Sequence, residues 1–245
     1  MYRFFSPIQN ISDYKIIISD KRQAHYLKDV LRLKIKDKVI AFDEKQNSYN
    51  CLIVKILSDK IILDIKKTTQ PLGNQNRASL AIACAIPKKS NMDDIIDKLT
   101  QLGVERIIPL KTKRVIVNLD EEKSQLRLIR WQKIAQSAAQ QSQRITLPII
   151  EPIQDIKEAI AESKDYDLKL IPTLSGQRKG LREVLEKYKP RSILVFIGPE
   201  GDFTEDEVSL AKLAGCVPIS LGSLVLRVET AAVAVASFIR LNEDR

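Results

Sequence analysis

SILVFIGPEGDF runs from Ser192 to Phe203 and contains two of the chain's eight glycines. Its first half, rich in β-branched and aromatic side chains, has the composition of a buried strand. Gly198 and Gly201 flank a proline and a glutamate, a combination that lets the backbone approach a ligand along a fixed path. Thr204 follows, with Glu207 three residues on, which is the pattern of a helix-capping box. The stretch therefore predicts a strand, a special loop and a helix over 204–214.

The same rhythm extends on both sides of this stretch. Apolar strands alternate with helical segments, which predicts an open, mainly parallel α/β sheet covered on both faces. The expected strands are 79–86, 106–110, 146–150, 167–172, 192–198 and 217–221, and the expected helices are 90–103, 121–143, 153–163, 179–187, 204–214 and 226–241. Sheets of this kind bind ligands at the carboxyl ends of their strands.

The front of the chain has a different pattern. Short alternating stretches predict strands at 15–19, 38–43, 48–57 and 60–67, with one helix at 22–32 between them. A small barrel of about five strands suits this length. Residues 68–78, TTQPLGNQNRA, have the composition of a linker. We therefore predict two domains, 1–72 and 73–245.

The charge of the chain favours a polyanionic partner. The net charge is +9, and residues 1–73 carry 14 basic against 8 acidic side chains, whereas residues 74–245 carry 26 against 23. Nucleic acid is the first candidate. No apolar run approaches the roughly 18–20 residues of a membrane helix, and the N-terminus lacks a signal sequence, so we expect a cytoplasmic protein without membrane contact. The odd number of cysteines, three, predicts reduced, buried thiols.

The chain lacks the residue patterns that several kinds of chemistry require. The single histidine, His25, and the absence of Cys-x-x-Cys or His-x-x-x-His spacing predict no metal site. There is no P-loop and no G-x-G-x-x-G, so nucleotide hydrolysis and nicotinamide binding are not expected. A Ser-His-Asp triad would need His25, but the chain has no G-x-S-x-G elbow. His25 is better explained as a partly packed surface residue.

A second loop resembles the first in character. Residues 222–230, GSLVLRVET, follow the strand at 217–221. Both loops can present backbone N–H and C=O groups to a planar ligand. On composition alone, ordinary strand-to-helix turns explain the two loops equally well.

Taken together, the runs GPEG (198–201) and LRVETA (226–231) resemble the signature of the SPOUT superfamily of RNA methyltransferases, specifically the RsmE-type enzymes that methylate a uracil nitrogen in small-subunit ribosomal RNA. Arg3-Phe4-Phe5, Leu102-Gly103-Val104 and the segment 138–144 extend the match. The resemblance implies an N-terminal PUA-like β-barrel that helps to hold RNA, followed by an α/β methyltransferase domain with a C-terminal trefoil knot. It also implies a homodimer, with the last helix and the cofactor loops near the subunit contact. That helix is apolar nearly all round, which burial in the monomer explains equally well.

The resemblance assigns S-adenosylmethionine as cofactor and N3 of a specific uridine in 16S ribosomal RNA, within the small subunit, as target. The residues implied for the cofactor pocket are Pro172, Thr173, Gly198, Glu200, Gly201, Leu221, Gly222 and Leu226. The acceptor nitrogen must lose a proton, so Arg227 and Glu229 are the catalytic candidates. Arg227 can stabilise an anion or hold a phosphate, and Glu229 is either a base or a helix-start acid. Arg114 and Arg144 are assigned to RNA, with Arg3 and Arg32 as weaker candidates.

The chain departs from the family pattern at a few positions. Asp202 stands where the family usually repeats glycine, so a carboxylate is expected at the mouth of the cofactor loop. Val115 replaces a serine, and Gln101 and Ser137 replace glutamates. Three other functions stay open at this point: an RNA-binding or assembly factor that has lost turnover, a metabolic α/β enzyme with incidental basic charge, and a methyltransferase for another base or RNA.

Overall fold

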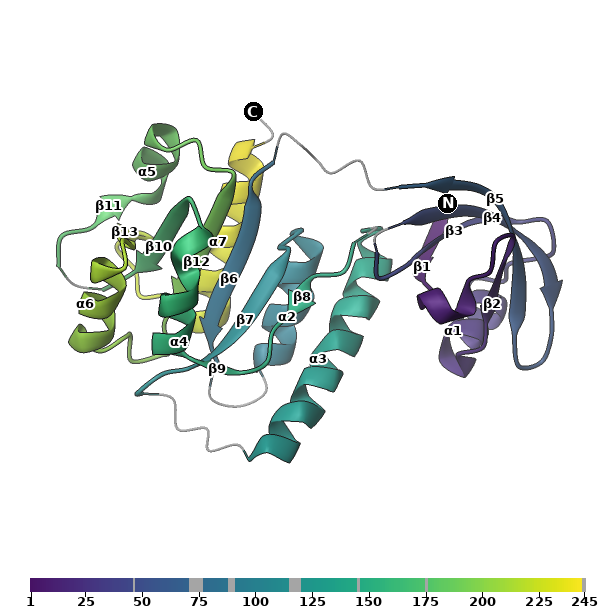
Figure 1. Cartoon of the computed structure of the whole chain (residues 1–245), viewed down its shortest axis with the longest axis horizontal. Coiled ribbons are helices and arrows are strands. Elements are labelled where there is room, and N and C mark those ends of the chain that lie inside the picture. The colour runs from purple at the N-terminus through teal and green to yellow at the C-terminus, as the bar shows by residue number, and fades with distance from the viewer. Residues whose placement is uncertain are drawn as a thin grey trace. The chain divides into compact units, whose positions relative to one another are not determined.

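The computed structural model describes residues 1–45, 47–70, 77–87, 91–114, 120–144, 146–174 and 176–243 (Figure 1). The chain divides into two compact units. The N-terminal unit comprises Met1–Gln75 together with Ala139–Leu147, and the C-terminal unit comprises Asn76–Ala138 and Pro148–Arg245. The predicted domain boundary, between residues 72 and 73, lies outside the described residues. The sequence offered no reason to associate 139–147 with the first unit.

In the described part of the N-terminal unit, five strands form one sheet in the order β1-β3-β4-β5-β2. These are β1 (Tyr2–Phe5), β2 (Lys15–Ile18), β3 (Lys38–Phe42), β4 (Ser48–Ile56) and β5 (Ile61–Thr69). β1 pairs with β3 in parallel, and the other pairs are antiparallel. Strand β1 was not predicted, because its four residues do not alternate between polar and apolar. The predicted helix 22–32 is shorter and irregular: α1 (Lys21–His25) continues as a π-helical turn, η2 (Tyr26–Val30), and a 3-10 turn, η1 (Ile8–Asn10), precedes β2.

Alternation explains how these strands pack. In β2, Ile16 and Ile18 are buried while Lys15 and Ile17 are exposed, as expected for a strand with one face on a core. A polar turn follows β3, where the buried Asp43 carboxylate accepts hydrogen bonds from the Asn47 side chain at 2.9 Å and the Tyr49 hydroxyl at 2.8 Å. Burial and this bond raise the pKa of Tyr49 to about 12. Phe5 and Phe42 meet edge to face and pack with Ala139, from the segment that joins this unit late in the sequence.

The C-terminal unit contains the predicted parallel sheet. Its strands are β6 (Ser79–Ala85), β7 (Arg106–Lys111), β8 (Ile149–Ile150), β9 (Gln154–Asp155), β10 (Leu168–Pro172), β11 (Lys179–Gly180), β12 (Ser192–Ile197) and β13 (Val217–Ser220). Among the described residues the order is β11-β13-β10-β12-β6-β7-β8, with β9 also on β7, and every pair is parallel. The two-residue strands β9 and β11 were not predicted, since so short a segment carries no periodicity.

Helices alternate with these strands as expected. They are α2 (Asn91–Gln101), α3 (Glu121–Gln141), α4 (Ile156–Ala161) with the 3-10 turn η3 (Glu162–Asp165), α5 (Leu181–Lys187), α6 (Glu205–Leu213) and α7 (Val228–Glu243). The predicted capping box of α6 is present between Thr204 and Glu207. The prediction for α7 was wrong at its start, because the helix begins at Val228 and leaves Leu226 and Arg227 in the preceding loop.

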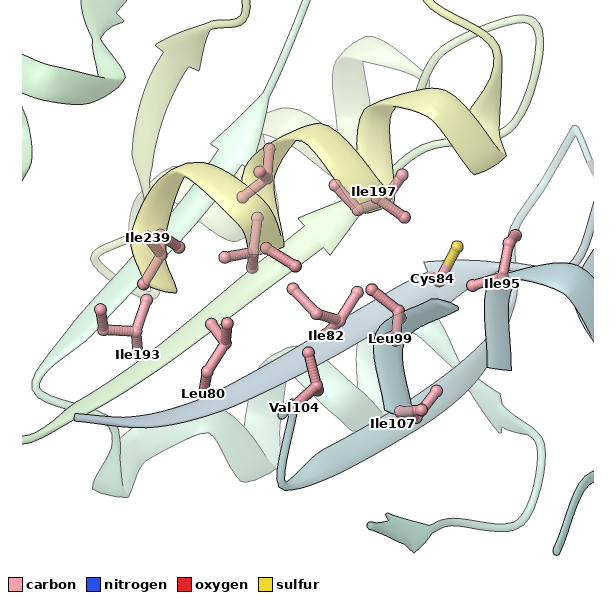
Figure 2. Packing of buried hydrophobic residues seen from close by; sticks show 14 of the residues in the cluster. Leu80, Ile82, Cys84, Ile95, Leu99, Val104, Ile107, Ile193, Ile197 and Ile239 are labelled. Carbon is pink, nitrogen blue, oxygen red and sulfur yellow. The ribbon is translucent and has the colours of Figure 1, made fainter. Parts of the chain in front are cut away.

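The side chains on the two faces of the central strands, β6 and β12, pack into two separate hydrophobic cores. In β6, Leu80, Ile82 and Cys84 pack on the face covered by α2, α3, α5 and α7, whereas Ala81 and Ala83 pack against α4 and α6. Figure 2 shows the first of these cores, with α7 lying over the strands. A strand buried on both faces needs apolar side chains at its buried positions, and β6 and β12 satisfy that need at every position after their first residues, Ser79 and Ser192.

All three cysteines are free and buried, as predicted. Burial raises the pKa of the Cys51 thiol to about 12 and that of Cys216 to about 11. Within the described chain, no helix combines the length and the apolar character that a membrane crossing requires.

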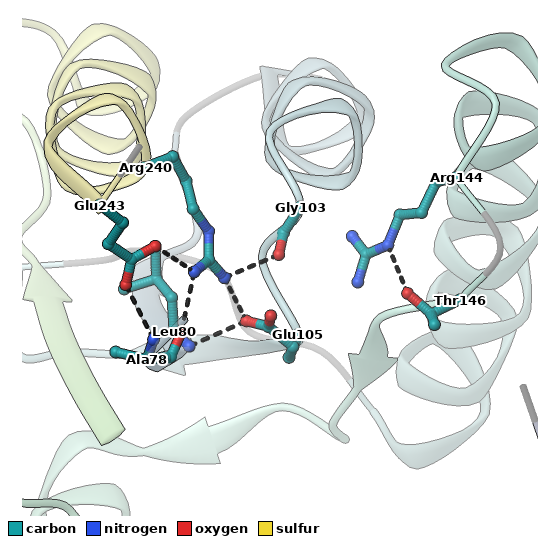
Figure 3. Close-up of polar contacts among 8 residues, drawn as sticks. All are labelled: Ala78, Leu80, Gly103, Glu105, Arg144, Thr146, Arg240 and Glu243. Carbon is teal, nitrogen blue, oxygen red and sulfur yellow. Dashed lines mark hydrogen bonds and ion pairs between the residues drawn. The ribbon is translucent and has the colours of Figure 1, made fainter. Parts of the chain in front are cut away.

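A buried arginine anchors α7 to the start of the sheet (Figure 3). The Arg240 side chain is only 7% exposed and donates to the carbonyl oxygens of Ala78 and Gly103, both at 2.8 Å. It also pairs with Glu243 at 2.9 Å and with Glu105. Glu243 and Glu105 accept in turn from the backbone N–H groups of Ala78 and Leu80. Both terminal nitrogens of the Arg240 guanidinium are therefore paired with carbonyl or carboxylate oxygens, whereas its buried Nε has no hydrogen-bond partner among the described residues.

Replacing Arg240 with methionine should strongly destabilise the C-terminal unit. The substitution retains an apolar side chain but leaves the Glu243 carboxylate and two backbone carbonyls without their donor, and breaking a buried pair from one side costs about 3 kcal/mol. Urea unfolding should show this loss. Arg182→Met removes the exposed ion pair with Glu186 (3.6 Å) and should change the free energy of unfolding by less than about 0.5 kcal/mol. Equal effects of the two substitutions would contradict the role of the network.

Candidate functional site

A pocket lies at the carboxyl ends of β10, β12 and β13, which are neighbours in the sheet. It encloses about 580 Å³ of space, part of it open to solvent. Its walls come from the loop after β10, the loop after β12, and the loop between β13 and α7. The lining residues are Pro172, Thr173, Leu174, Arg178, Ile197, Gly198, Pro199, Glu200, Asp202, Leu221, Gly222, Leu224, Val225, Leu226, Val228 and Ala231.

Most residues predicted for the cofactor meet here. Of the eight, all but Gly201 line the pocket. Gly201 instead lies against Arg114, whose guanidinium donates to the Gly201 carbonyl oxygen. The structure thus brings together in space loops that the sequence separates by dozens of residues.

Gly198 is required by close packing. A Cβ atom at this position would lie 3.2 Å from the ring of Phe203, which is buried. The loop after β12 then closes on itself, because the Asp202 N–H donates to the Pro199 carbonyl at 2.9 Å. The backbone of the GPEG run is thereby held against the pocket.

Gly222 is required for a different reason. Its φ of +120° is a conformation that L side chains rarely adopt, yet a Cβ atom there would have nothing within 4 Å. The demand is therefore conformational and not steric. Leu224 and Val225 follow as exposed apolar side chains, 78% and 71% accessible, on the pocket wall.

Arg178 is a site residue that the sequence analysis missed. Among the described lining residues it is the only basic side chain, and its Nη1 donates to the Thr173 carbonyl at 3.0 Å. It stands in a stretch with no distinctive motif, SGQRKG, which was predicted to lead directly into a helix. Only the adjacency of β10 and β13 could have indicated its position.

The two predicted catalytic residues flank the pocket but do not line it. Arg227 is exposed and directly precedes α7, and its carbonyl accepts the Ala231 N–H at 2.8 Å. Glu229 is half-buried in the first turn of α7, where an acid favours the helix dipole. Burial, and to a lesser extent the negative charges of Glu229 and Glu200, raise the pKa of the Cys84 thiol. The two carboxylates therefore lie near the same end of β6.

The predicted RNA-binding arginines fall into two groups. Arg3, Arg32 and Arg144 belong to the N-terminal unit. Arg3 donates to the carbonyl of Gln143, next to Arg144, and Arg144 donates to the Thr146 hydroxyl at 2.9 Å (Figure 3). Arg32 is exposed with a φ of 53°. Arg114 belongs to the C-terminal unit and contacts the loop after β12. The neighbouring Val115 lies outside the described residues.

Metal-binding side chains do not cluster in the part of the chain that the structure describes: no group of three or more His, Cys, Asp or Glu is placed to hold an ion there. His25 lies on the surface, with Nδ1 2.7 Å from the Asp29 carboxylate.

Comparison with known proteins identifies the class. A family model described as an RNA methyltransferase domain matches residues 74–240, and one described as an RNA methyltransferase PUA domain matches residues 18–66. The fold is thus that of a PUA-containing RNA methyltransferase. The chain belongs to this family, in the group of ribosomal RNA small subunit methyltransferase E.

Relatives of that name support this group along nearly the whole chain. The protein from Rickettsia conorii is 31% identical over 93% of this chain and 90% of its own length, and that from Bacillus subtilis is 28% identical over 94% and 93%. A crystal structure of ribosomal RNA small subunit methyltransferase E from Neisseria gonorrhoeae bound to S-adenosyl methionine is 27% identical, with a TM-score of 0.83 over 99% of this chain and 98% of that one.

Gly222→Ala should destabilise the protein through backbone strain alone. An L side chain at a φ of +120° costs about 1–3 kcal/mol, and no neighbouring atom contributes. Urea unfolding should show a loss of at least about 1 kcal/mol. Ser223→Ala, at the exposed neighbouring residue, is the control and should leave stability within about 0.5 kcal/mol of the wild type. An unchanged midpoint for Gly222→Ala would mean that the loop relaxes to another conformation.

Proposed function

We propose that this chain is an S-adenosylmethionine-dependent methyltransferase that methylates N3 of a specific uridine in 16S ribosomal RNA. The observation that carries the proposal is the pocket at the ends of β10, β12 and β13, lined by seven of the eight residues that the sequence assigned to the cofactor. The related enzyme from Neisseria gonorrhoeae, which shares the fold, was crystallised with this cofactor.

The pocket suits an adenosyl group attached to an amino acid. Leu221, Leu224, Val225 and Leu226 provide apolar surface for a flat ring. Gly198 has no side chain and lies in a tightly packed part of the loop, so its backbone groups can select ring nitrogens. Arg178 supplies a positive charge for the carboxylate of the amino acid part. When bound, the cofactor supplies an activated methyl group on a sulfonium.

The protein must also favour loss of the proton on the acceptor nitrogen. Arg227 is exposed directly before α7 and outside the pocket lining, so its charge is available to the incoming base, where it stabilises the developing anion. Glu229, near the end of β6, acts as the base or stabilises the start of α7. Alignment of the acceptor with the methyl donor and exclusion of water complete the task.

RNA contact is assigned to the N-terminal unit and its basic residues. Most of the excess of positive charge lies in the first 73 residues, and in the N-terminal unit Arg3 donates to the carbonyl of Gln143, next to Arg144. Arg32, exposed at the end of η2, adds a third guanidinium. Arg114 stays a predicted RNA contact, although its hydrogen bonds are to the loop after β12.

Further features belong to the same proposal. We propose a trefoil knot in the C-terminal unit, supported by the position of β10 between β12 and β13 and the return of α7 to β6. We also propose a homodimer that acts in the cytoplasm on the small ribosomal subunit. Exposed apolar side chains suited to a subunit contact lie on two elements. They are Phe238 and Leu241 on α7, and Leu224 and Val225 in the loop between β13 and α7. Light scattering tests the dimer.

The experiment that tests the proposed function measures cofactor binding and maps the methylated bases of ribosomal RNA. Calorimetric titration of the purified protein with S-adenosylmethionine should show one site. Ribosomal RNA from cells with and without the gene should differ by one methylated uridine. If cells without the gene keep every methylated base, or lose a methyl group from a base other than uridine, the assignment of the target is overturned.

Arg227→Ala should lower turnover by about 100-fold while changing the Kd for S-adenosylmethionine by less than about threefold, because Arg227 lies outside the pocket lining. Arg178→Ala should do the reverse, weakening cofactor binding by about tenfold through loss of a charge-assisted bond. Calorimetry and single-turnover methylation separate the two effects. Collapse of cofactor binding in Arg227→Ala, with normal turnover of the bound complex, would place Arg227 in the pocket instead.

Binding of a 16S ribosomal RNA fragment should weaken steeply with salt, because phosphate contacts release counterions. Arg32→Gln, which removes the charge but keeps an unbranched polar side chain at the left-handed backbone position, should reduce the slope of log K against log salt by about one. Fluorescence anisotropy at several salt concentrations measures this. The control is Arg182→Gln on α5, with an expected slope equal to that of the wild type. A flat salt dependence in the unaltered protein would argue against RNA as the partner.

A further inference from the structure

We propose that Asp202 is a positioning residue of the cofactor pocket, which holds the loop after β12 against the loop after β10. The inference rests on the proposed function, because it concerns how the pocket is shaped for its ligand. Sequence analysis expected the opposite, a free carboxylate at the mouth of the pocket. The contacts of the side chain decide between these interpretations.

The backbone at Asp202 keeps the conformation that a glycine would supply. Its φ is 61°, in the left-handed region, and aspartate is among the few non-glycine residues that adopt this region readily. The path of the loop is therefore compatible with glycine or aspartate, and the difference between them lies in the side chain.

Both carboxylate oxygens of Asp202 accept backbone hydrogen bonds. Oδ1 accepts the N–H of Phe203 at 2.8 Å, and Oδ2 accepts the N–H of Leu174 at 2.9 Å. Phe203 lies in the same loop as Asp202, whereas Leu174 lies in the loop after β10, 28 residues earlier. One side chain therefore connects two walls of the pocket, and bonds from N–H groups to an ionised oxygen are strong.

The residues at both ends of this link shape the pocket. Leu174 lines it and is 49% exposed, so its backbone is not fixed by burial of its own side chain. Phe203 is buried, and its ring limits the space at Gly198. Arg114 completes the arrangement, because its guanidinium donates to the carbonyls of Gly201 and Asp202.

The link should matter most for cofactor affinity. With both oxygens bonded to N–H groups of the protein, the carboxylate orders the loop after β10 before the ligand arrives, which reduces the ordering cost of binding. Asp202 acts through the loops that it joins, and no step of methyl transfer passes through it.

The test compares three variants by S-adenosylmethionine calorimetry, thermal unfolding and amide hydrogen exchange. Asp202→Gly keeps the left-handed backbone and removes both acceptors, so Kd should rise about tenfold and the Leu174 amide should exchange at least tenfold faster. Asp202→Asn keeps one neutral acceptor and should lie between Asp202→Gly and the wild type. Glu205→Gln removes an exposed carboxylate at the start of α6 and should leave both quantities unchanged.

The outcomes separate this inference from the proposed function. If the wild type binds the cofactor and Asp202→Gly binds it equally well, the positioning role is overturned. If Glu205→Gln alters Kd as much as Asp202→Gly does, local charge and not the link is responsible, which also overturns it. If the wild type binds no S-adenosylmethionine, the proposed function fails, and exchange of the Leu174 amide alone decides whether the link exists.

Discussion

Burial of β6 and β12 on both faces is the constraint from which the site follows. Their side chains alternate between two cores, so among the residues of β6 and β12 only Ile197, at the end of β12, lines the pocket. Parallel pairing places the ends of β10, β12 and β13 at one edge, and polar groups can gather only in the loops that leave this edge. The site is built mainly from loops because the side chains within the central strands are used for packing.

The Arg240 network fixes the other end of the same arrangement. It joins the last helix to the first residues of β6 and to the end of α2, so α7 cannot shift along the sheet without exposing buried charge. Val228 and Ala231, at the opposite end of α7, line the pocket. Residues 221–227 therefore connect two anchored elements, and Gly222, at a φ of +120° that L side chains rarely adopt, lets the chain make this connection.

Periodicity and composition were enough to predict the parallel sheet, the capped helix α6 and the buried cysteines, because each depends on local pattern or on simple burial. They missed β1, whose four residues find their partner β3 more than thirty positions away. They also missed the inclusion of 139–147 in the first unit, since packing of Ala139 on Phe5 and Phe42 is invisible to local pattern. The predicted pocket residues, in three loops, came from the family resemblance, whereas Arg178 belongs to no motif and is brought there only by strand order.

Asp202 shows why a departure from a family motif need not imply loss of function. A family motif gives the residue that relatives usually have at a position. At position 202 the backbone requires only a left-handed conformation, which aspartate can adopt. Once that demand is met, the added carboxylate is judged by its surroundings. Two backbone N–H groups point at it, so the substitution adds bonds to a loop that glycine would have left less ordered. The same residue in a loop without those donors would have left an unpaired carboxylate at the mouth of the cofactor loop, which is what the sequence alone suggested.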